Sequence, residues 1–222
     1  RVQRLAAAAR SAEVPSIRSQ EGELLWYRGL LLHRDAGSNL VRRAMAKAAM
    51  LSGATPVIDD GELIVGRPCH RALTVEEQSE LDGYRLAARM MPELGGQASH
   101  MAVDYEKLLR LGILGVREEI QGRRSQLDPS DPADIGKDQF YRACLASLDG
   151  VLKYARQYAR HARQLAGQAD ETRQAELLAI AESLDAVPAH PAKTFREALQ
   201  SVHLLTFCLE GLYQLGRPDR YL

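Results

Sequence analysis

Aromatic residues are few in this 222-residue sequence, and it has neither a long apolar run nor an excess of charge of either sign. Phe, Trp and Tyr make up only 5% of the residues, whereas Ala, Leu and Arg are abundant, so a helical protein is expected. The formal net charge is zero, so no overall field would draw the chain to nucleic acid or to an anionic membrane. No apolar run approaches the roughly 20 residues that cross a bilayer. Nucleic-acid and membrane partners are therefore not expected.

Cysteine is also rare, and its spacing excludes two common uses. Cys69, Cys144 and Cys208 are far apart and odd in number, which matches neither a disulfide framework nor a common zinc spacing. We therefore expect a reducing, cytoplasmic location and no metal site. Residues 1–15 contain no signal-peptide core, and the chain begins at Arg1 rather than Met, which favours a truncated N-terminus.

Most of the chain instead carries apolar residues at the spacing of amphipathic helices. The longest such stretch covers residues 138–166. Gly112 interrupts a helical pattern that begins near residue 105, so a kink is expected there. The predicted helices are 1–12, 23–32, 39–53, 74–90, 105–111, 113–120, 138–166, 173–184 and 194–209.

Two of these helices begin with a capping box. Thr74 is followed by Glu77, and Thr194 is followed by Glu197. In this pattern the hydroxyl and the carboxylate each accept a hydrogen bond from an otherwise free backbone amide. The pattern therefore predicts helix starts at both threonines.

Two short segments depart from the helical pattern. Residues 56–59 and 62–66 are β-prone runs on either side of Asp60 and Gly61, a pair that suits a tight hairpin turn. Residues 128–132 contain two prolines, which disfavour helix at the residues before them, so any domain boundary would lie there. The predicted fold class is therefore mainly α, with one small β-hairpin.

Three segments, in sequence order, resemble the motifs of one enzyme family. Residues 59–66 read DDGELIVG, residues 100–109 read HMAVDYEKLL and precede Gly112, and residues 187–200 read VPAHPAKTFREALQ. They resemble the motifs D-x-E-L-I-V-G, H-x-x-x-D-Y-x-K-L-L and V-P-x-x-P-A-x-T-F-x-E-A-L-Q of the glycyl radical enzymes of the pyruvate formate-lyase type. Residues 216–222, GRPDRYL, are similar to the family's G-R-x-D-Q-Y-L, so the resemblance covers essentially the whole chain.

The resemblance implies that residues 1–222 are the N-terminal portion of a longer protein, a ten-stranded α/β barrel. Any sub-boundary within this portion would lie at the proline-containing residues 128–132. Family members store a radical on a glycine near the C-terminus and use a thiyl cysteine to abstract hydrogen from the substrate. Neither motif is present in this chain. We therefore expect no catalytic residue in this segment, which would be inactive alone.

The resemblance also implies partners. The glycyl radical is installed by a separate S-adenosylmethionine-dependent iron–sulfur activating enzyme, and family members are typically homodimers. Some are packaged behind a bacterial microcompartment shell, so the expected location is cytoplasmic, either free or inside such a compartment. No cofactor is expected to bind this segment itself.

His100 is the candidate substrate-binding residue, and Ser99 is a second candidate. Pyruvate-using members have an arginine at the position of His100, and its forked guanidinium suits a carboxylate. Members that dehydrate diols and triols resemble this chain in having a histidine, which both donates and accepts hydrogen bonds and so suits an alcohol. Asp104 is better explained as a helix cap, and Tyr105 as a packing aromatic.

Two other polar patterns have structural explanations. Asp59 and Asp60 are adjacent carboxylates, but successive side chains of an extended segment point to opposite faces, which favours a turn over a metal site. Basic residues recur at helical spacing from Lys153 to Arg163, and we expect a solvated helix face rather than an RNA-binding one.

The predicted function is that of a glycyl radical lyase or dehydratase acting on a small polar substrate such as a 1,2-diol or glycerol. This segment would contribute scaffold and part of the substrate pocket. The alternatives are a formate C-acetyltransferase-like enzyme, another C–C, C–N or C–S lyase of the same family, or a non-catalytic helical binding module.

Overall fold

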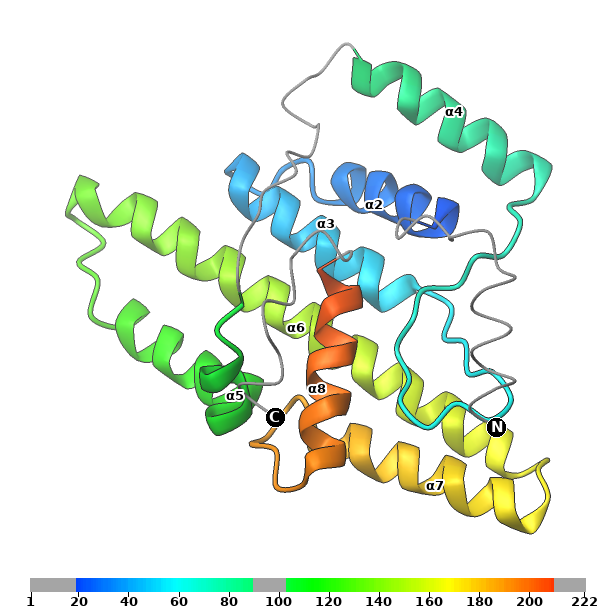
Figure 1. The fold of residues 1–222 in the computed structure, drawn as a ribbon. Helices are drawn as coiled ribbons and strands as arrows, with labels where there is room; N and C mark the ends of the chain where they lie inside the picture. Colours follow the sequence, from blue (N-terminus) through cyan, green and yellow to red (C-terminus); the bar gives the residue numbers. More distant parts are fainter. Residues whose placement is uncertain (1–18, 90–102, 210–222) are drawn as a thin grey trace.

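The computed structural model describes residues 19–89 and 103–209, and these ranges are helical without any β-strand (Figure 1). The predicted helix 1–12 lies outside the described residues. None of the described helices is both long enough and apolar enough to cross a bilayer. The helices are α2 (Gln20–Leu32), α3 (Asn39–Gly53), α4 (Val75–Arg89), α5 (Tyr105–Arg124), α6 (Pro132–Ala166), α7 (Glu171–Ala186) and α8 (Phe195–Cys208).

Helix α6 is the centre of the described structure. It packs along α3 and α7, and it also contacts α5 and α8, while α2 covers α3 and α4 lies beside α2 at the edge (Figure 1). The core around α6 contains Tyr158, Ile180 and Leu204, none of which is more than 1% exposed. On α6 the buried residues Ala155 and Ala159 recur at helical spacing, so the amphipathic pattern of the sequence correctly predicts the buried face of this helix.

Small residues allow three of the helices to pack closely. A Cβ added at Gly150 of α6 would lie 2.7 Å from the Cα of Ala48 in α3, and one added at Gly29 of α2 would lie 2.8 Å from the Cα of Ala46. Both distances are shorter than any real Cβ contact, so only glycine fits at these two crossings. The α2, α3 and α6 backbones therefore pack against one another without an intervening side chain.

Both predicted capping boxes are present. The Thr74 hydroxyl accepts from the Glu77 amide (3.2 Å), while the Glu77 carboxylate accepts from the Thr74 amide (3.0 Å). Thr194 and Glu197 form the same reciprocal pair at the start of α8. The kink predicted in α5 is confirmed, because Gly112 has φ 66° and ψ 171° inside this helix.

The start of α6 differs from the prediction. The helix begins at Pro132 rather than at residue 138, because Asp131 caps it by accepting from the Ala133 amide (2.8 Å). Proline is tolerated in a first helical turn, where its missing N–H would have no partner. The two prolines therefore mark a helix start, and the domain boundary suggested at 128–132 stays a prediction.

The predicted β-hairpin is wrong. The turn itself forms, because the Asp59 carbonyl accepts from the Glu62 amide (3.1 Å) and Gly61 has φ 85°. Residues 54–74, however, contain no strand. Apart from the turn, several of their backbone groups bond to side chains of the helices, chiefly those of α6, α7 and α8.

Gln200 of α8 takes the place of a neighbouring strand. Its side-chain amide donates to the Val65 carbonyl (2.7 Å), and its oxygen accepts from the Val65 amide (3.0 Å). On the other side, Tyr154 of α6 donates to the Gly66 carbonyl (2.9 Å). Tyr158 accepts from the Val57 amide (3.3 Å) and donates to the Arg67 carbonyl. These bonds satisfy backbone groups that a second strand would otherwise satisfy.

Candidate functional site

The candidate substrate-binding residues, His100 and Ser99, lie outside the described residues. The structure does describe the point at which the chain resumes. Asp104 caps α5 by accepting from the Lys107 amide (2.9 Å), as predicted, and Tyr105 is only 2% exposed. Tyr105, which follows the candidate segment in sequence, is therefore fixed in the core.

The kink at Gly112 is a docking point for the turn that precedes α8. The Ile113 amide donates to the Pro188 carbonyl (2.8 Å), and the Leu114 amide donates to the Ala189 carbonyl (3.0 Å). These two amides are available because the kink removes them from the regular bonding of the helix. A Cβ at residue 112 would lie 2.5 Å from the Ala189 oxygen, so the site requires glycine.

The three motif segments are thus joined to one another. The second and third meet at Gly112, and the first and third meet where Gln200 bonds both backbone groups of Val65. Gly66 of the first motif, with φ 134°, also packs against α8, because an added Cβ would lie 3.3 Å from the Cα of Leu204. The motif residues that the structure describes therefore act together as a scaffold.

A buried carboxylate joins α2 to the segment before α4. Glu21 is 4% exposed, and its oxygens accept from the Thr55 hydroxyl (2.7 Å) and the Thr55 amide (3.1 Å). Arg71 donates to Glu21 (2.7 Å) and bridges to Glu77 of α4 through two bonds of 2.7 and 2.8 Å. The bonds from Arg71 lower the pKa of Glu77 to about 2. These groups are fully paired, so we assign them a structural role.

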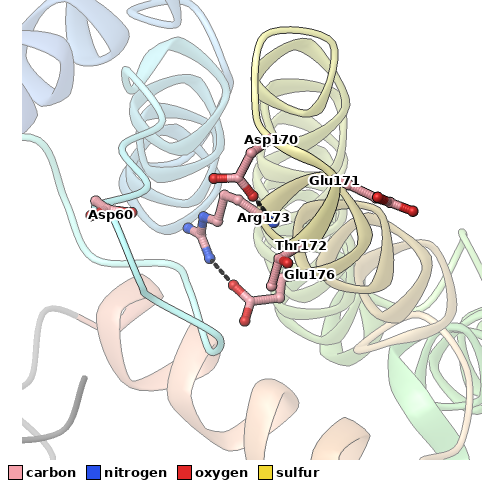
Figure 2. Close-up of a pocket in the computed structure, with 6 residues that line it drawn as sticks. All are labelled: Asp60, Asp170, Glu171, Thr172, Arg173 and Glu176. Atoms are coloured by element: carbon pink, nitrogen blue, oxygen red, sulfur yellow. Dashed lines mark hydrogen bonds and ion pairs between the residues drawn. The ribbon is translucent and has the colours of Figure 1, made fainter.

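A polar hollow of about 420 Å³ lies where the turn at Asp60 faces the first turn of α7 (Figure 2). Arg173 donates to the Glu62 carbonyl (2.8 Å), to the Asp59 carbonyl (3.0 Å) and to Glu176 (3.0 Å). Asp170 caps α7 by accepting from the Arg173 amide (2.9 Å). Arg173 therefore holds the turn against α7, and Asp59 and Asp60 lie in a turn, as predicted.

No metal site is found among the described residues, which contain no group of three or more His, Cys, Asp or Glu side chains able to hold an ion. The basic residues Lys153, Arg156 and Arg160 are exposed on α6, whereas the neighbouring Tyr154 and Tyr158 are buried. Neither tyrosine is therefore available on the exposed basic face, where it would be needed to stack on an RNA base. A solvated helix face remains its explanation.

The three cysteines lie on structural elements. Cys208, near the end of α8, is 1% exposed, and burial raises the pKa of its thiol to about 12. Burial also raises the pKa of Cys144 on α6, and Cys69 is 9% exposed in the extended segment. A thiol that is buried and protonated is a poor nucleophile.

Sequence reasoning missed the residues that organise this scaffold. Gln200 was recognised only as the last letter of a motif, and Tyr154 and Tyr158 only as neighbours of basic residues. Each lies on the apolar face of its helix, as the positions of Leu204 on α8 and Ala155 on α6 indicate. A polar side chain on the buried, apolar face of a helix requires a hydrogen-bond partner. A polar residue at such a position was therefore the sequence signal that could have identified these three residues.

Comparison with known protein families shows the family to which the chain belongs. The sequence profile of the pyruvate formate lyase-like proteins matches residues 87–222, more than half of the chain, and so includes the second and third motifs. The chain belongs to this family. The predicted relationship to the glycyl radical enzymes of the pyruvate formate-lyase type is thereby confirmed.

Similar proteins of this family are lyases and dehydratases by name. The isethionate sulfite-lyase of Bilophila wadsworthia is 39% identical over 127 residues, which cover 53% of this chain and 15% of that protein. A probable dehydratase of Escherichia coli, YbiW, is 34% identical over 130 residues, which cover 56% of this chain and 16% of that protein. This chain thus spans less than a fifth of the length of either relative.

The fold is also that of a known structure. A solved structure that addresses 1,2-propanediol dehydration in Roseburia inulinivorans aligns with a TM-score of 0.79 at 22% identity. The alignment covers 95% of this chain and 34% of that chain. At this identity the likeness concerns the fold alone.

Proposed function

We propose that this pyruvate formate lyase-like chain is part of a glycyl radical lyase or dehydratase that acts on a small polar substrate such as a 1,2-diol or glycerol. The observation that carries the proposal is the joining of the three motif segments at Gly112 and Gln200. The names of the two relatives support the reaction class. The segment contributes scaffold and one part of the substrate pocket, and it is inactive alone.

His100 contributes a hydrogen bond to a substrate hydroxyl, with Ser99 beside it. Neutral imidazole donates at one nitrogen and accepts at the other, so a single side chain can orient an alcohol whether its hydroxyl acts as a hydrogen-bond donor or as an acceptor. A forked guanidinium at the same position would favour a carboxylate instead. Asp104 and Tyr105 support this role by anchoring the residues that follow.

The radical chemistry depends on groups outside this chain. A stored glycyl radical would supply the cysteine thiyl radical that abstracts hydrogen from the substrate carbon, and its installation would require an S-adenosylmethionine-dependent iron–sulfur activating enzyme. The buried Cys208 is unsuited to meeting a substrate. The working protein is a homodimer in the cytoplasm, free or enclosed by a bacterial microcompartment shell.

A sulfite-lyase is the second candidate, because the relative with 39% identity carries that name. Isethionate has a hydroxyl group like a diol, but its sulfonate group would leave as sulfite when the C–S bond breaks. A neutral or positively charged His100 accommodates either substrate. The choice between C–O and C–S cleavage therefore depends on residues outside this chain.

The test is to activate the complete protein that contains this chain under anaerobic conditions and to offer 1,2-propanediol, glycerol, isethionate and pyruvate separately. Aldehyde from a diol is the expected product, sulfite would identify the second candidate, and formate from pyruvate would exclude both. A preparation that forms the radical but acts on none of them would contradict the proposed substrate class.

His100→Ala is expected to lower kcat/KM for the accepted alcohol roughly tenfold or more, the effect of losing a substrate hydrogen bond in a closed site. His161→Ala, on the outer part of α6, serves as the matched control and is expected to leave kcat/KM unchanged. Equal activity of the His100→Ala protein would remove His100 from the pocket.

A further inference from the structure

Helix α4 is attached to the rest of the protein by a mainly polar interface. Leu81 is its only buried residue. The side of α4 away from α2 carries Val75 and Leu86, which are 82% and 65% exposed. Apolar burial therefore contributes little to holding this helix in place.

Three ion pairs supply most of the specific contacts of α4. Arg28 of α2 makes bonds of 2.9 and 2.6 Å to Glu80, and Arg85 makes bonds of 3.0 and 2.6 Å to Glu23 of α2. Each is a forked, two-bond pair, the geometry in which an arginine and a carboxylate interact best. Arg71, just before α4, forms the third pair with Glu77.

One aromatic contact completes the interface. The rings of Tyr27 and Tyr84 have centroids 5.6 Å apart, and the Tyr84 hydroxyl donates to Glu80 (2.7 Å). The side chains of all three ion pairs remain partly open to water, with Arg85 38% exposed and Arg28 42% exposed. Ion pairs of this kind contribute little each and are screened by salt.

The two crossings of α3 are built differently. At the α2–α3 and α3–α6 crossings, Gly29 and Gly150 bring the helix backbones into direct contact with Ala46 and Ala48. These contacts are apolar and closely packed, so dissolved ions have no charged groups to screen there. Among the described helices, α4 thus depends on exposed ion pairs, whereas the two crossings of α3 depend on close apolar packing.

We propose that α4 separates from α2 as a single unit when the ion pairs of α4 are screened or broken. Helices α3, α6 and α7 stay folded when this happens. Local opening of this kind is expected where few apolar contacts hold an element. The chain continues from α4 at Arg89 towards the residues that include His100. When α4 separates from α2, Arg89, the residue from which that stretch starts, is no longer held in place.

Hydrogen exchange of the purified protein, followed by mass spectrometry, tests the proposal. Raising NaCl from about 0.1 M to about 1 M shortens the Debye length from about 10 Å to about 3 Å. We expect the amides of α4 to exchange at least tenfold faster at the higher salt, with α6 unchanged. Arg85→Glu is expected to produce the same selective change at low salt.

The double variant Glu23→Arg, Arg85→Glu restores opposite charges and is expected to return α4 to slow exchange. Arg163→Glu, which removes the exposed pair with Asp185 between α6 and α7, is the control and should leave α4 unchanged. If the exchange rate of the α4 amides changes neither with salt nor in the Arg85→Glu variant, the proposal is overturned. So would loss of protection in α3 and α6 together with α4, because the helix would then not be separable.

Discussion

At the scale of single residues, Gly112 has the most demanding environment in the described structure. Its φ of 66° lies in the left-handed region, and the backbone of Ala189 and His190 leaves no room for a Cβ. Two independent requirements, one on conformation and one on space, therefore act on the same residue. Few single positions combine both.

Gly112→Ala is expected to lower the free energy of unfolding by roughly 2–5 kcal/mol, the sum of a left-handed non-glycine residue and an overpacked contact. Gly122→Ala, near the end of the same helix, is the matched control, because an added Cβ there meets no atom within 4 Å. This control should stabilise the protein by about 0.5–1 kcal/mol. Urea unfolding measures both, and equal stabilities of the two variants would refute the role of Gly112.

Gln200 is the second residue with a demanding environment, because it is 1% exposed and bonds both backbone groups of Val65. Gln200→Ala leaves a buried N–H and a buried carbonyl without partners. We expect it to cost roughly 2–6 kcal/mol, at about 1–3 kcal/mol for each orphaned group. Gln174→Ala, at an exposed position of α7, should change the unfolding midpoint little, and a similar loss in both variants would show that Gln200 is not special.

At the scale of helices, the sequence predicts starts and kinks well. Thr74 and Thr194 begin helices because a capping box is a local pattern, complete within four residues. Gly112 was recognised for the same reason, since glycine inside a helical pattern is itself a signal. Local chemistry of this kind needs no knowledge of the rest of the fold.

The hairpin prediction failed at the same scale for the opposite reason. The turn at Asp60 and Gly61 is local and does form, but the partner of the β-prone run is a glutamine 135 residues away. No local pattern distinguishes a strand that pairs with its neighbour from an extended segment held by distant side chains. The candidate site could be predicted only through family resemblance, because His100 alone has no distinguishing chemistry.

At the scale of the whole molecule, the ion pairs give stability a definite pH dependence. The bonds from Arg71 and Arg28 lower the pKa values of Glu77 and Glu80 to about 2, from an ordinary value of 4.5. A carboxylate with a lowered folded pKa contributes stability above its unfolded pKa and loses that contribution as the pH falls through the folded value. Glu62, whose pKa is raised by burial, acts in the opposite direction.

We therefore expect the urea midpoint to fall as the pH is lowered from about 5 to about 2.5. The double variant Glu77→Gln, Glu80→Gln should show a shallower fall over the same range, because two of the responsible groups no longer titrate. Glu118→Gln, at an exposed position of α5, is the control and should keep the slope of the unaltered protein. A midpoint independent of pH in this range would show that Glu62 and similar groups cancel the effect.

The hydrogen bonds from α6 and α8 that hold residues 57–67 also have a consequence during synthesis. The segment leaves the ribosome early, but Tyr154 and Gln200 follow 88 and 135 residues behind the groups that they bond. At translation rates of about 5–20 residues per second, Val65 waits about 7–27 s for Gln200. During that interval an extended, β-prone stretch has unpaired backbone groups, so the nascent chain is most exposed to misassociation before α8 is made.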